Sequence, residues 1–498
     1  MGSLTRILSN TFYLSLDWVA LTLGGYIYWI LMSKMLSVAD IGQFSTISNT
    51  ALFLAGISGL GMNVAVTKLF PEYQIKNKTD SIPPSISWTL KITTLATVLI
   101  GAILILLSRT VSHEIFSQYN VLFIAAMAVL TNFLYMTSGY LFGLQKMKEI
   151  FKSDVILTLL KVGLTVPLII YGFGYLGPVY SFLAAAAIAT LLRWKWLPRG
   201  GGQPDRKKLW FYSIPVLVSS AGTTMINQGS VVLLSLFSTP INVGIFSILF
   251  YITSPVRMIP QLISNGMFPT MSQKWAANDT DQIQKIVSKA VKYSTFIVIP
   301  LIISLSIFSK EIVILLTTPD YLSISNMFFF MSLAYMFSGM STIFTNILYS
   351  SGDVKSFRNS NLVGGFLNLV IGAIAIVKFG VAGAVAGFLL SNFSMLVFSF
   401  YLIRKKVKLP VNNSNLFKLV LSCSIFVMVS RTAANNPDPF VWAPSIVLAF
   451  LIYASSLVVL GFFDKLDLRI IEELEKRSTG RGKNIVGKMV SFLQKFAN

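Results

Sequence analysis

Charged residues are scarce in this chain of 498 residues. Asp, Glu, Lys and Arg together make up 12% of it, against about 25% in ordinary soluble domains. Hydrophobic residues make up 54%, and the mean hydropathy is +0.71. A composition this apolar excludes an ordinary soluble protein and is typical of a chain that lies largely in a membrane.

The residue types of metal and redox chemistry are almost missing. Cys423 is the single cysteine, which excludes an intrachain disulfide, and His113 is the single histidine. The 19 acidic residues lie nearly all outside the apolar runs and form no paired-carboxylate motif. No G-x-x-x-x-G-K-S/T phosphate loop is present either. We therefore expect no catalytic residue, no metal site and no cofactor, and a protein that is not an enzyme.

Long apolar runs are abundant instead. A membrane-spanning helix needs about 20 predominantly apolar residues, and helices are the default because each span must satisfy its own backbone hydrogen bonds. The sequence therefore predicts an all-α polytopic membrane protein with about 14 transmembrane helices. Two pairs of spans, within 155–194 and 359–403, have almost no loop between them. The predicted spans are 10–32, 41–66, 86–108, 119–141, 155–174, 176–194, 209–237, 240–271, 291–308, 324–349, 359–379, 380–403, 415–432 and 441–463.

The distribution of Lys and Arg predicts the orientation. With the N-terminus in the cytoplasm, few of the 40 cations fall in outer loops, and short cytoplasmic loops favour Lys and Arg. We therefore expect a multi-pass protein of the cell membrane with both termini in the cytoplasm. The net charge of +21 mostly reflects this bias, so we expect no nucleic-acid partner. The outer-loop cations are Lys34, Arg109, Lys310, Lys378 and Arg431.

The chain also repeats itself at an offset of about two hundred residues. Several short matches occur in the same order, which favours a duplicated six-helix unit. Because six is even, both copies enter the membrane from the same side, so the repeats are parallel and enclose a central cavity. The matches are Asp40-Ile41-Gly42 with Asn242-Val243-Gly244, Phe70-Pro71 with Phe268-Pro269, Thr79-Asp80 with Thr280-Asp281, and "GYLG" at 174–177 with "GVAG" at 380–383.

This repeat divides the chain into four parts. Residues 1–200 form an N-terminal six-helix bundle and residues 205–408 a C-terminal one. Two additional transmembrane helices occupy 409–463, and a basic amphipathic cytoplasmic tail occupies 464–498. The tail has apolar residues at helical spacing among lysines, which indicates a helix on the anionic inner leaflet; a solvated polar tail is the alternative.

Among the charges inside predicted spans, three stand out: Asp17, Lys161 and Arg257. A charge at the centre of a membrane helix costs about 2.5–3.5 kcal/mol on insertion scales and usually marks a functional pathway. Arg257 is followed on its helical face by further polar residues, which favours a polar ligand over a purely structural role. Asp17 would bind a coupling ion or balance charge. The predicted substrate-binding residues are Arg257, Lys161, Gln261, Asn265, Asn227, Asn49 and Asn368; for the neutral ones, hydrogen bonding between helices is the alternative.

Two segments resemble a known family. "LSVADIGQFSTISNTALFLAGISGLGMNVAVTKLFPEY" (36–73) is similar to the first loop and second helix of the polysaccharide-biosynthesis (Wzx-type) oligosaccharide flippases. These belong to the MOP superfamily with the MATE drug exporters. The matching motifs are Ile41-Gly42-Gln43-Phe44, where Ile41 replaces the usual aromatic residue, Gly59-Leu60-Gly61 and Phe70-Pro71-Glu72-Tyr73. "SSGDVKSFRNSNLVGGFLNLVIGAIAIVKFGVAGAVAG" (350–387) resembles their eleventh and twelfth helices.

The resemblance implies a flippase. It would move a lipid-linked oligosaccharide, of the polyprenyl phosphate or pyrophosphate type, from the cytoplasmic to the outer leaflet by alternating access. Cationic residues in the cavity would receive the phosphate, and glycosyltransferases or polymerases of surface polysaccharide or glycoprotein assembly are possible partners. The alternative is a cation-coupled multidrug exporter of the MATE type that uses Asp17, although two buried cations against one acid are the wrong charge for cationic substrates.

Overall fold

The computed structural model describes residues 2–108, 118–407, 413–434, 436, 438–464 and 467. In these ranges every regular element is a helix, which confirms the predicted all-α membrane fold. The elements are α1 Gly2–Met35, α2 Val38–Ser58, α3 Met62–Ile75, η1 Thr79–Ser81, α4 Ile82–Ser108, α5 Gln118–Gly143, α6 Met147–Ile170, α7 Leu176–Trp194, α8 Arg206–Phe237, α9 Pro240–Thr253, α10 Pro255–Ala276, α11 Thr280–Ile307, α12 Ser309–Leu316, η3 Pro319–Met327, α13 Phe328–Ser350, α14 Val354–Arg404, α15 Asn413–Arg431 and α16 Pro439–Val459.

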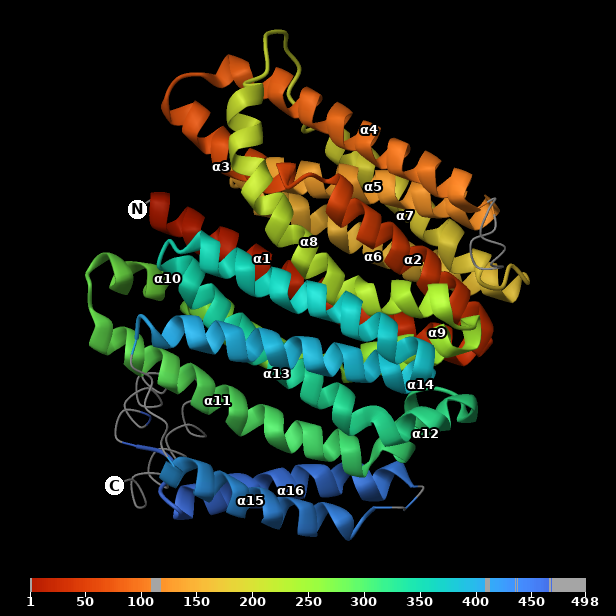
Figure 1. Ribbon diagram of the computed structural model, residues 1–498, viewed down its shortest axis with the longest axis vertical. Coiled ribbons are helices and arrows are strands. Elements are labelled where there is room, and N and C mark those ends of the chain that lie inside the picture. The colour runs from red at the N-terminus through yellow and green to blue at the C-terminus, as the bar shows by residue number, and fades with distance from the viewer. Residues whose placement is uncertain are drawn as a thin grey trace.

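The long helices lie side by side and roughly parallel to one another (Figure 1). α4 lies at one edge of the row, and α15 and α16 lie at the opposite edge. Of the described helices, 11 are long and apolar enough to cross a membrane, and the α2–α3 and α9–α10 pairs add two bent spans. If α14 is counted as two crossings, for the reason that follows, the described residues contain the 14 predicted spans.

α14 is too long for one crossing. At about 1.5 Å per residue, a straight helix of its 51 residues would extend about 77 Å, far beyond a hydrocarbon core of about 30 Å. Its backbone reverses at Gly380, which has φ 55° and ψ −125°. The two arms then pack closely, because a Cβ at Gly387 would lie 2.6 Å from the Cα of Gly372. The 359–403 pair is therefore a helical hairpin with almost no loop.

The matched motifs of the two halves occupy matched places in the fold. Gly174 turns the chain between α6 and α7 with φ 52°, as Gly380 does within α14. The spans α2–α3 and α9–α10 are bent by 47° and 45°. The division into bundles at 1–200 and 205–408 stays a prediction, and a duplicated unit would produce these paired features.

The helices α2 and α9 also begin alike. The Oγ of Ser37 accepts a hydrogen bond from the amide of Asp40, and the Oγ1 of Thr239 accepts one from the amide of Asn242. Such caps satisfy amides that the first turn of a helix leaves without partners. The two caps are 202 residues apart, so the repeated sequence motif starts the same element in each half.

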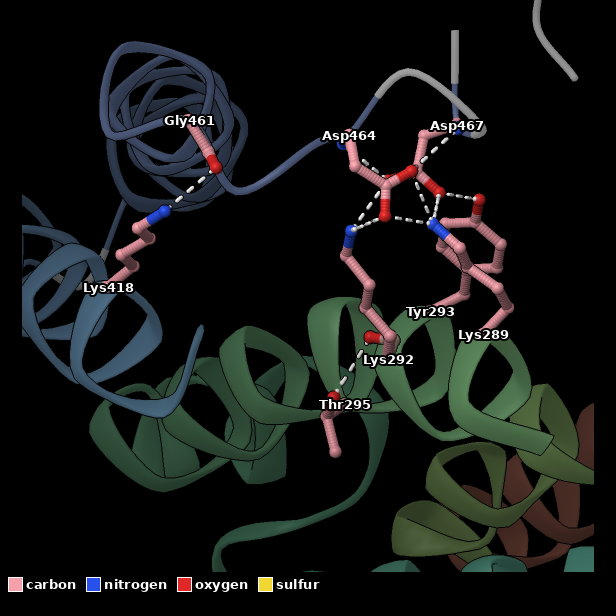
Figure 2. A network of polar contacts seen from close by, with 8 residues as sticks. All are labelled: Lys289, Lys292, Tyr293, Thr295, Lys418, Gly461, Asp464 and Asp467. Carbon is pink, nitrogen blue, oxygen red and sulfur yellow. Dashed lines mark hydrogen bonds and ion pairs between the residues drawn. The ribbon is translucent and has the colours of Figure 1, made fainter. Parts of the chain in front are cut away.

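The C-terminal pair α15 and α16 packs on α11. Beyond α16, Asp464 and Asp467 form ion pairs with Lys289 and Lys292 of α11 (Figure 2). Tyr293 also donates a hydrogen bond to Asp467. This acidic tether fastens the end of the C-terminal pair to α11. The predicted amphipathic tail lies outside the described residues from 468 onwards.

Candidate functional site

A cavity of about 690 Å³ lies between α2–α3 and α5 on one side and α8 on the other. The last turn of α13 and the first turn of α14 contribute Tyr349 and Phe357 to it. The first turns of α8 also contribute, through Phe211 and Tyr212. The cavity therefore lies toward the end of the molecule at which α8 and α14 begin, and it draws on residues from both predicted bundles.

The bend between α2 and α3 shapes this cavity. Leu60 and Gly61 both have positive φ, 53° and 67°, a conformation that costs little only for glycine. A Cβ at Gly61 would lie 2.5 Å from the carbonyl oxygen of Ser213. The lack of a side chain at Gly61 thus lets α3 begin against the backbone of α8, and α3 then carries Asn63 and Lys68 into the wall.

The cavity wall is rich in neutral polar groups. Hydroxyl and amide side chains both donate and accept hydrogen bonds, which suits a ligand with many hydroxyl groups. Asn132 of α5 is held in place by donating to Ser58 and Thr97 at 2.7 Å each, so its amide is fixed before any ligand arrives. The polar lining residues are Asn63, Asn132, Ser219, Ser220, Thr223, Thr224, Asn227 and Gln228.

One cation completes the wall. Among the described residues that line the cavity, Lys68 is the cation and carboxylates are absent. Its Nζ lies 4.0 Å from the centre of the Tyr212 ring, which holds the ammonium group by a cation–π contact. Aromatic rings accompany it: Tyr135, Phe211, Tyr212, Tyr349 and Phe357. The lining therefore offers hydrogen bonds, flat apolar faces and positive charge together.

Arg257 lies directly behind this wall. It stands in the first turn of α10, and its Nη1 donates a 2.9 Å hydrogen bond to the Oδ1 of Asn227, which lines the cavity. The Nε of Arg257 is buried and has no hydrogen-bond partner among the described residues. A guanidinium group held by so few partners inside a membrane protein is costly, so its position indicates a role beyond packing.

The other predicted substrate-binding residues lie apart from the cavity wall. Lys161 stacks over the Tyr28 ring, 4.3 Å from its centre, between α6 and α1. The amide of Asn368 donates to the carbonyl of Met225 and accepts from Ser230. The contacts of Asn368 are interhelical hydrogen bonds, the alternative that the sequence left open for the neutral polar residues.

Asn49 likewise makes contacts within the protein, because its amide donates to the backbone and side chain of Ser45. Gln261 is half-buried and Asn265 is exposed on α10, downstream of Arg257. Neither lines the cavity described above. Of the seven predicted substrate-binding residues, the structure brings Asn227 and Arg257 together at the cavity.

Asp17 belongs to a separate buried group in the N-terminal half. Arg193, 2% exposed, forms an ion pair with Asp154 and donates to Ser153 and to the carbonyl of Leu134, at 2.8 Å each. Asp17 interacts electrostatically with both charged residues, and its Oδ1 is buried with no hydrogen-bond partner among the described residues. α1, α6 and α7 thus bring two acids and one cation together.

At the end of the molecule away from the cavity, the backbones of α2 and α9 approach each other closely. The hydroxyls of Ser45 on α2 and Ser247 on α9 lie 2.5 Å apart. A Cβ at Gly42 would lie 1.8 Å from the carbonyl oxygen of Pro240. Trp29 and Tyr251 stack beside this contact with ring centres 4.0 Å apart. The halves therefore meet where α2 and α9 begin and enclose the cavity toward the other end.

Sequence reasoning missed several of these residues. Lys68 lies just beyond the predicted end of its span, and Arg193 was grouped with the cytoplasmic cations. Asn132 follows Thr131 in a largely apolar helix that carries no charge, and nothing in the pattern distinguishes it from the other polar residues of α5. By contrast, the polar stripe at Ser220, Thr224 and Asn227 was visible in the sequence and does line the cavity.

Two family profiles match the chain. The profile of the polysaccharide biosynthesis protein family matches residues 7–275, which is more than half of the chain. The profile of the lipid II flippase MurJ matches residues 213–452. Both families consist of transport proteins and not of enzymes.

Among curated proteins, an uncharacterised membrane protein of Methanocaldococcus jannaschii is 22% identical over 437 residues, which cover 81% of this chain and 85% of the relative. A probable low-salt glycan biosynthesis flippase, Agl15 of Haloferax volcanii, is 23% identical over 216 residues, which cover 43% of this chain and 46% of the relative.

Among solved structures, the lipid II flippase MurJ in an inward closed conformation aligns with a TM-score of 0.70 at 14% identity, covering 90% of this chain and 98% of that one. A MATE family multidrug resistance transporter of the MOP superfamily, in its inward-facing conformation, aligns with a TM-score of 0.57 at 14% identity, covering 80% and 98%. At such identities these likenesses establish the fold.

Proposed function

Because the chain belongs to the polysaccharide biosynthesis protein family, a group of multi-pass flippases of the MOP superfamily, we propose that it moves a lipid-linked oligosaccharide across the membrane. The carrier is a polyprenyl phosphate or pyrophosphate, and movement runs from the cytoplasmic to the outer leaflet. The product serves surface polysaccharide or glycoprotein assembly, in which glycosyltransferases or polymerases would be partners. The glycan biosynthesis flippase of Haloferax volcanii supports this substrate class.

The observation that carries the proposal is the composition of the cavity wall. Hydroxyl and amide groups, aromatic faces and Lys68 line about 690 Å³, with Arg257 behind Asn227. Moving unpaired polar groups into hydrocarbon costs several kcal/mol each, so a sugar chain crosses only if a protein supplies its hydrogen bonds. A cation and fixed amides supply them for a phosphate and its sugars.

The orientation of the protein sets the direction. Basic loops favour the cytoplasm, which supports an orientation with the N-terminus, and the end of the molecule at which α8 and α14 begin, on the cytoplasmic side. The lipid-linked sugar is made on that side in this proposal, and it enters the cavity with its lipid tail outside. An inside-negative membrane potential assists outward movement of a negative head by about 2.3 kcal/mol per charge per 100 mV.

A cation-coupled exporter of the MATE type is the second candidate. The observation in its favour is Asp17, whose Oδ1 is buried near the Arg193–Asp154 pair and has no hydrogen-bond partner in the part of the chain that the structure describes. Such an acid could take up a coupling ion. The cavity argues for the flippase, because its lining carries a cation and not the carboxylates that a cationic drug requires.

Proteoliposomes that contain the purified chain test the two candidates side by side. One assay follows a polyprenyl-pyrophosphate oligosaccharide to the opposite leaflet, and the other follows efflux of a cationic dye driven by an ion gradient. We expect flipping by the wild type and its loss in Arg257→Ala, with normal protein yield. Dye efflux that disappears in Asp17→Asn, without lipid movement, would establish the exporter instead.

A further inference from the structure

A second cavity, of about 650 Å³, lies on the outside of the N-terminal half. It is a groove between α4 and the end of α7, with one ring from α5 at its base. It is separate from the substrate cavity, because the two share no lining residue. Nothing in the proposed flipping cycle uses it.

Most of the groove is apolar and faces outward. Leu95 and Val98 of α4 are 53% and 51% exposed, and Trp194 at the end of α7 is 56% exposed. The Trp194 ring stacks on Phe133 with centres 5.7 Å apart, which gives the groove a flat apolar base. Such a surface on the outer edge of a membrane protein contacts lipid chains.

Two cations interrupt this apolar lining. Lys91 of α4 and Arg199 after α7 both line the groove, and both are exposed. Neither has an ion pair or a hydrogen bond to a side chain in the described part of the protein, and no carboxylate lines the groove there. Lys91 lies nine residues beyond the start of α4, about 14 Å along the helix axis. Lys91 also lies within the predicted span 86–108, where a cation without an anionic partner is costly, so a negative partner would stabilise it.

In the C-terminal half, the cation that corresponds to Lys91 is Lys292, and it has an anionic partner. Lys91 lies 11 residues after Asp80, and Lys292 lies 11 residues after Asp281. The two aspartates belong to the matched Thr-Asp motifs, which stand just before α4 and in the first turn of α11. On α11, Lys292 meets the carboxylate of Asp467 at 2.5 Å, in the acidic tether shown in Figure 2. The pair α15 and α16 covers that face of α11, whereas α4 lies uncovered at the edge of the molecule in Figure 1.

From this contrast we propose that the groove between α4 and α7 binds an anionic membrane phospholipid. Its phosphate lies between Lys91 and Arg199, and one acyl chain follows Leu95 and Val98 over the Trp194–Phe133 base. The phosphate takes the place that Asp467 holds on the other half. The site requires neither the oligosaccharide nor flipping, so its test is independent of the proposed function.

Trp194 serves as the reporter in the test. The full chain is placed in phosphatidylcholine vesicles that contain a small fraction of either brominated phosphatidylglycerol or brominated phosphatidylcholine, because bromine quenches tryptophan fluorescence at close range. The difference between the wild type and Trp194→Phe isolates the signal of Trp194. We expect brominated phosphatidylglycerol to quench this signal at about tenfold lower mole fraction, as two cations near an anionic headgroup would cause.

Charge variants test the cause of that preference. The double variant Lys91→Gln/Arg199→Gln should lose it, and Lys91→Arg/Arg199→Lys should keep it. The control Lys207→Gln/Lys355→Gln removes two exposed cations outside the groove and should also keep it. Equal quenching by the two lipids in the wild type would overturn the proposal, and so would a preference that survives the loss of Lys91 and Arg199 or disappears in the control.

Discussion

At the scale of single residues, the contact between Arg257 and Asn227 connects a buried charge to the cavity. Asn227 accepts the 2.9 Å hydrogen bond with its side-chain Oδ1 and lines the cavity, with the guanidinium group behind it. We expect Arg257 to act on a ligand partly through Asn227. If the two residues act as one unit, the effects of their substitutions on the flipping rate should not add.

We expect Arg257→Ala and Asn227→Ala each to lower the flipping rate by about 10- to 100-fold, since a hydrogen bond to a charged group contributes about 1.5–3 kcal/mol. The double variant should be little worse than either single variant, because each removes the same unit. Initial rates in proteoliposomes give the comparison. A double variant whose rate falls by the product of the two single reductions would show that the residues act separately.

The sequence predicted these two residues for a physical reason that does not extend to the whole site. A charge and a polar stripe inside an apolar span indicate function because hydrocarbon penalises them. The same reasoning selected Asn368, whose amide bonds to α8, and Asn49, whose amide bonds to Ser45 one turn earlier on its own helix. The sequence cannot tell which face of a helix meets the cavity. Lys68 was not predicted, because the hydropathy pattern does not show the bend at Gly61 that brings α3 into the cavity wall.

At the scale of elements, the contact between α2 and α9 depends on two glycines. A Cβ at Gly42 would lie 1.8 Å from a backbone oxygen of α9, and one at Gly244 would lie 2.1 Å from the carbonyl oxygen of Val38. Backbone atoms on both sides leave no flexible side chain that could move aside. The repeated glycine of the sequence motif is therefore required at this crossing.

We expect Gly42→Ala to lower the stability of the protein by about 1–3 kcal/mol through overpacking. The matched control is Gly266→Ala, where no heavy atom lies within 4 Å of the added Cβ and alanine favours the helix. Thermal unfolding midpoints of the two variants in the same detergent give the answer. Midpoints that agree within error would contradict the close contact.

The acidic tether at the end of α16 gives a pH prediction. Burial raises the pKa of the Asp467 carboxyl, but hydrogen bonds from Lys289, Lys292 and Tyr293 outweigh it and lower this pKa to about 2. The pKa of an aspartate in an unfolded chain is about 3.9. Because the folded value is the lower one, the tether stabilises the protein above about pH 4 and loses its effect as the pH falls toward 2.

The measurement compares wild type with Asp467→Asn. We expect the wild type to unfold at a higher temperature by a constant margin from pH 7 to about pH 4, and the margin to shrink below that. The control Asp80→Asn removes an exposed carboxylate that forms no ion pair in the described residues, and it should leave the unfolding temperature of the protein unchanged across this range. A margin that is already gone at pH 6 would contradict the tether.

Element lengths were easier to predict than element breaks. Each apolar run became a helix, because lipid offers no partner for a free backbone amide. The bends at Gly61 and between α9 and α10 depend on single backbone angles and close approaches that hydropathy does not record. The break within the 51-residue α14 was predictable, because the spans 359–379 and 380–403 divide at Gly380, where the helix reverses.

At the scale of the whole molecule, two similar halves enclose one cavity with unlike walls. They meet beside the cavity, where α3 begins against the backbone of α8, and again beyond the cavity where α2 and α9 begin, at the Ser45–Ser247 contact. Alternating access requires this contact to open while the opposite end closes. The proposed function therefore rests on movement between the halves, and not within either of them.

Crosslinking tests that movement most directly. In a Cys423→Ser background, cysteines replace Ser45 and Ser247, whose hydroxyls lie 2.5 Å apart across the halves. The control replaces Thr165 and Ser181, whose hydroxyls also lie 2.5 Å apart but within the N-terminal half. Flipping of the lipid-linked oligosaccharide is measured in proteoliposomes after oxidation and again after reduction.

We expect oxidation to stop flipping in the Ser45→Cys/Ser247→Cys protein, reduction to restore it, and the control pair to flip in both states. Normal flipping with the bond between the halves fully formed would contradict alternating access across the α2–α9 contact.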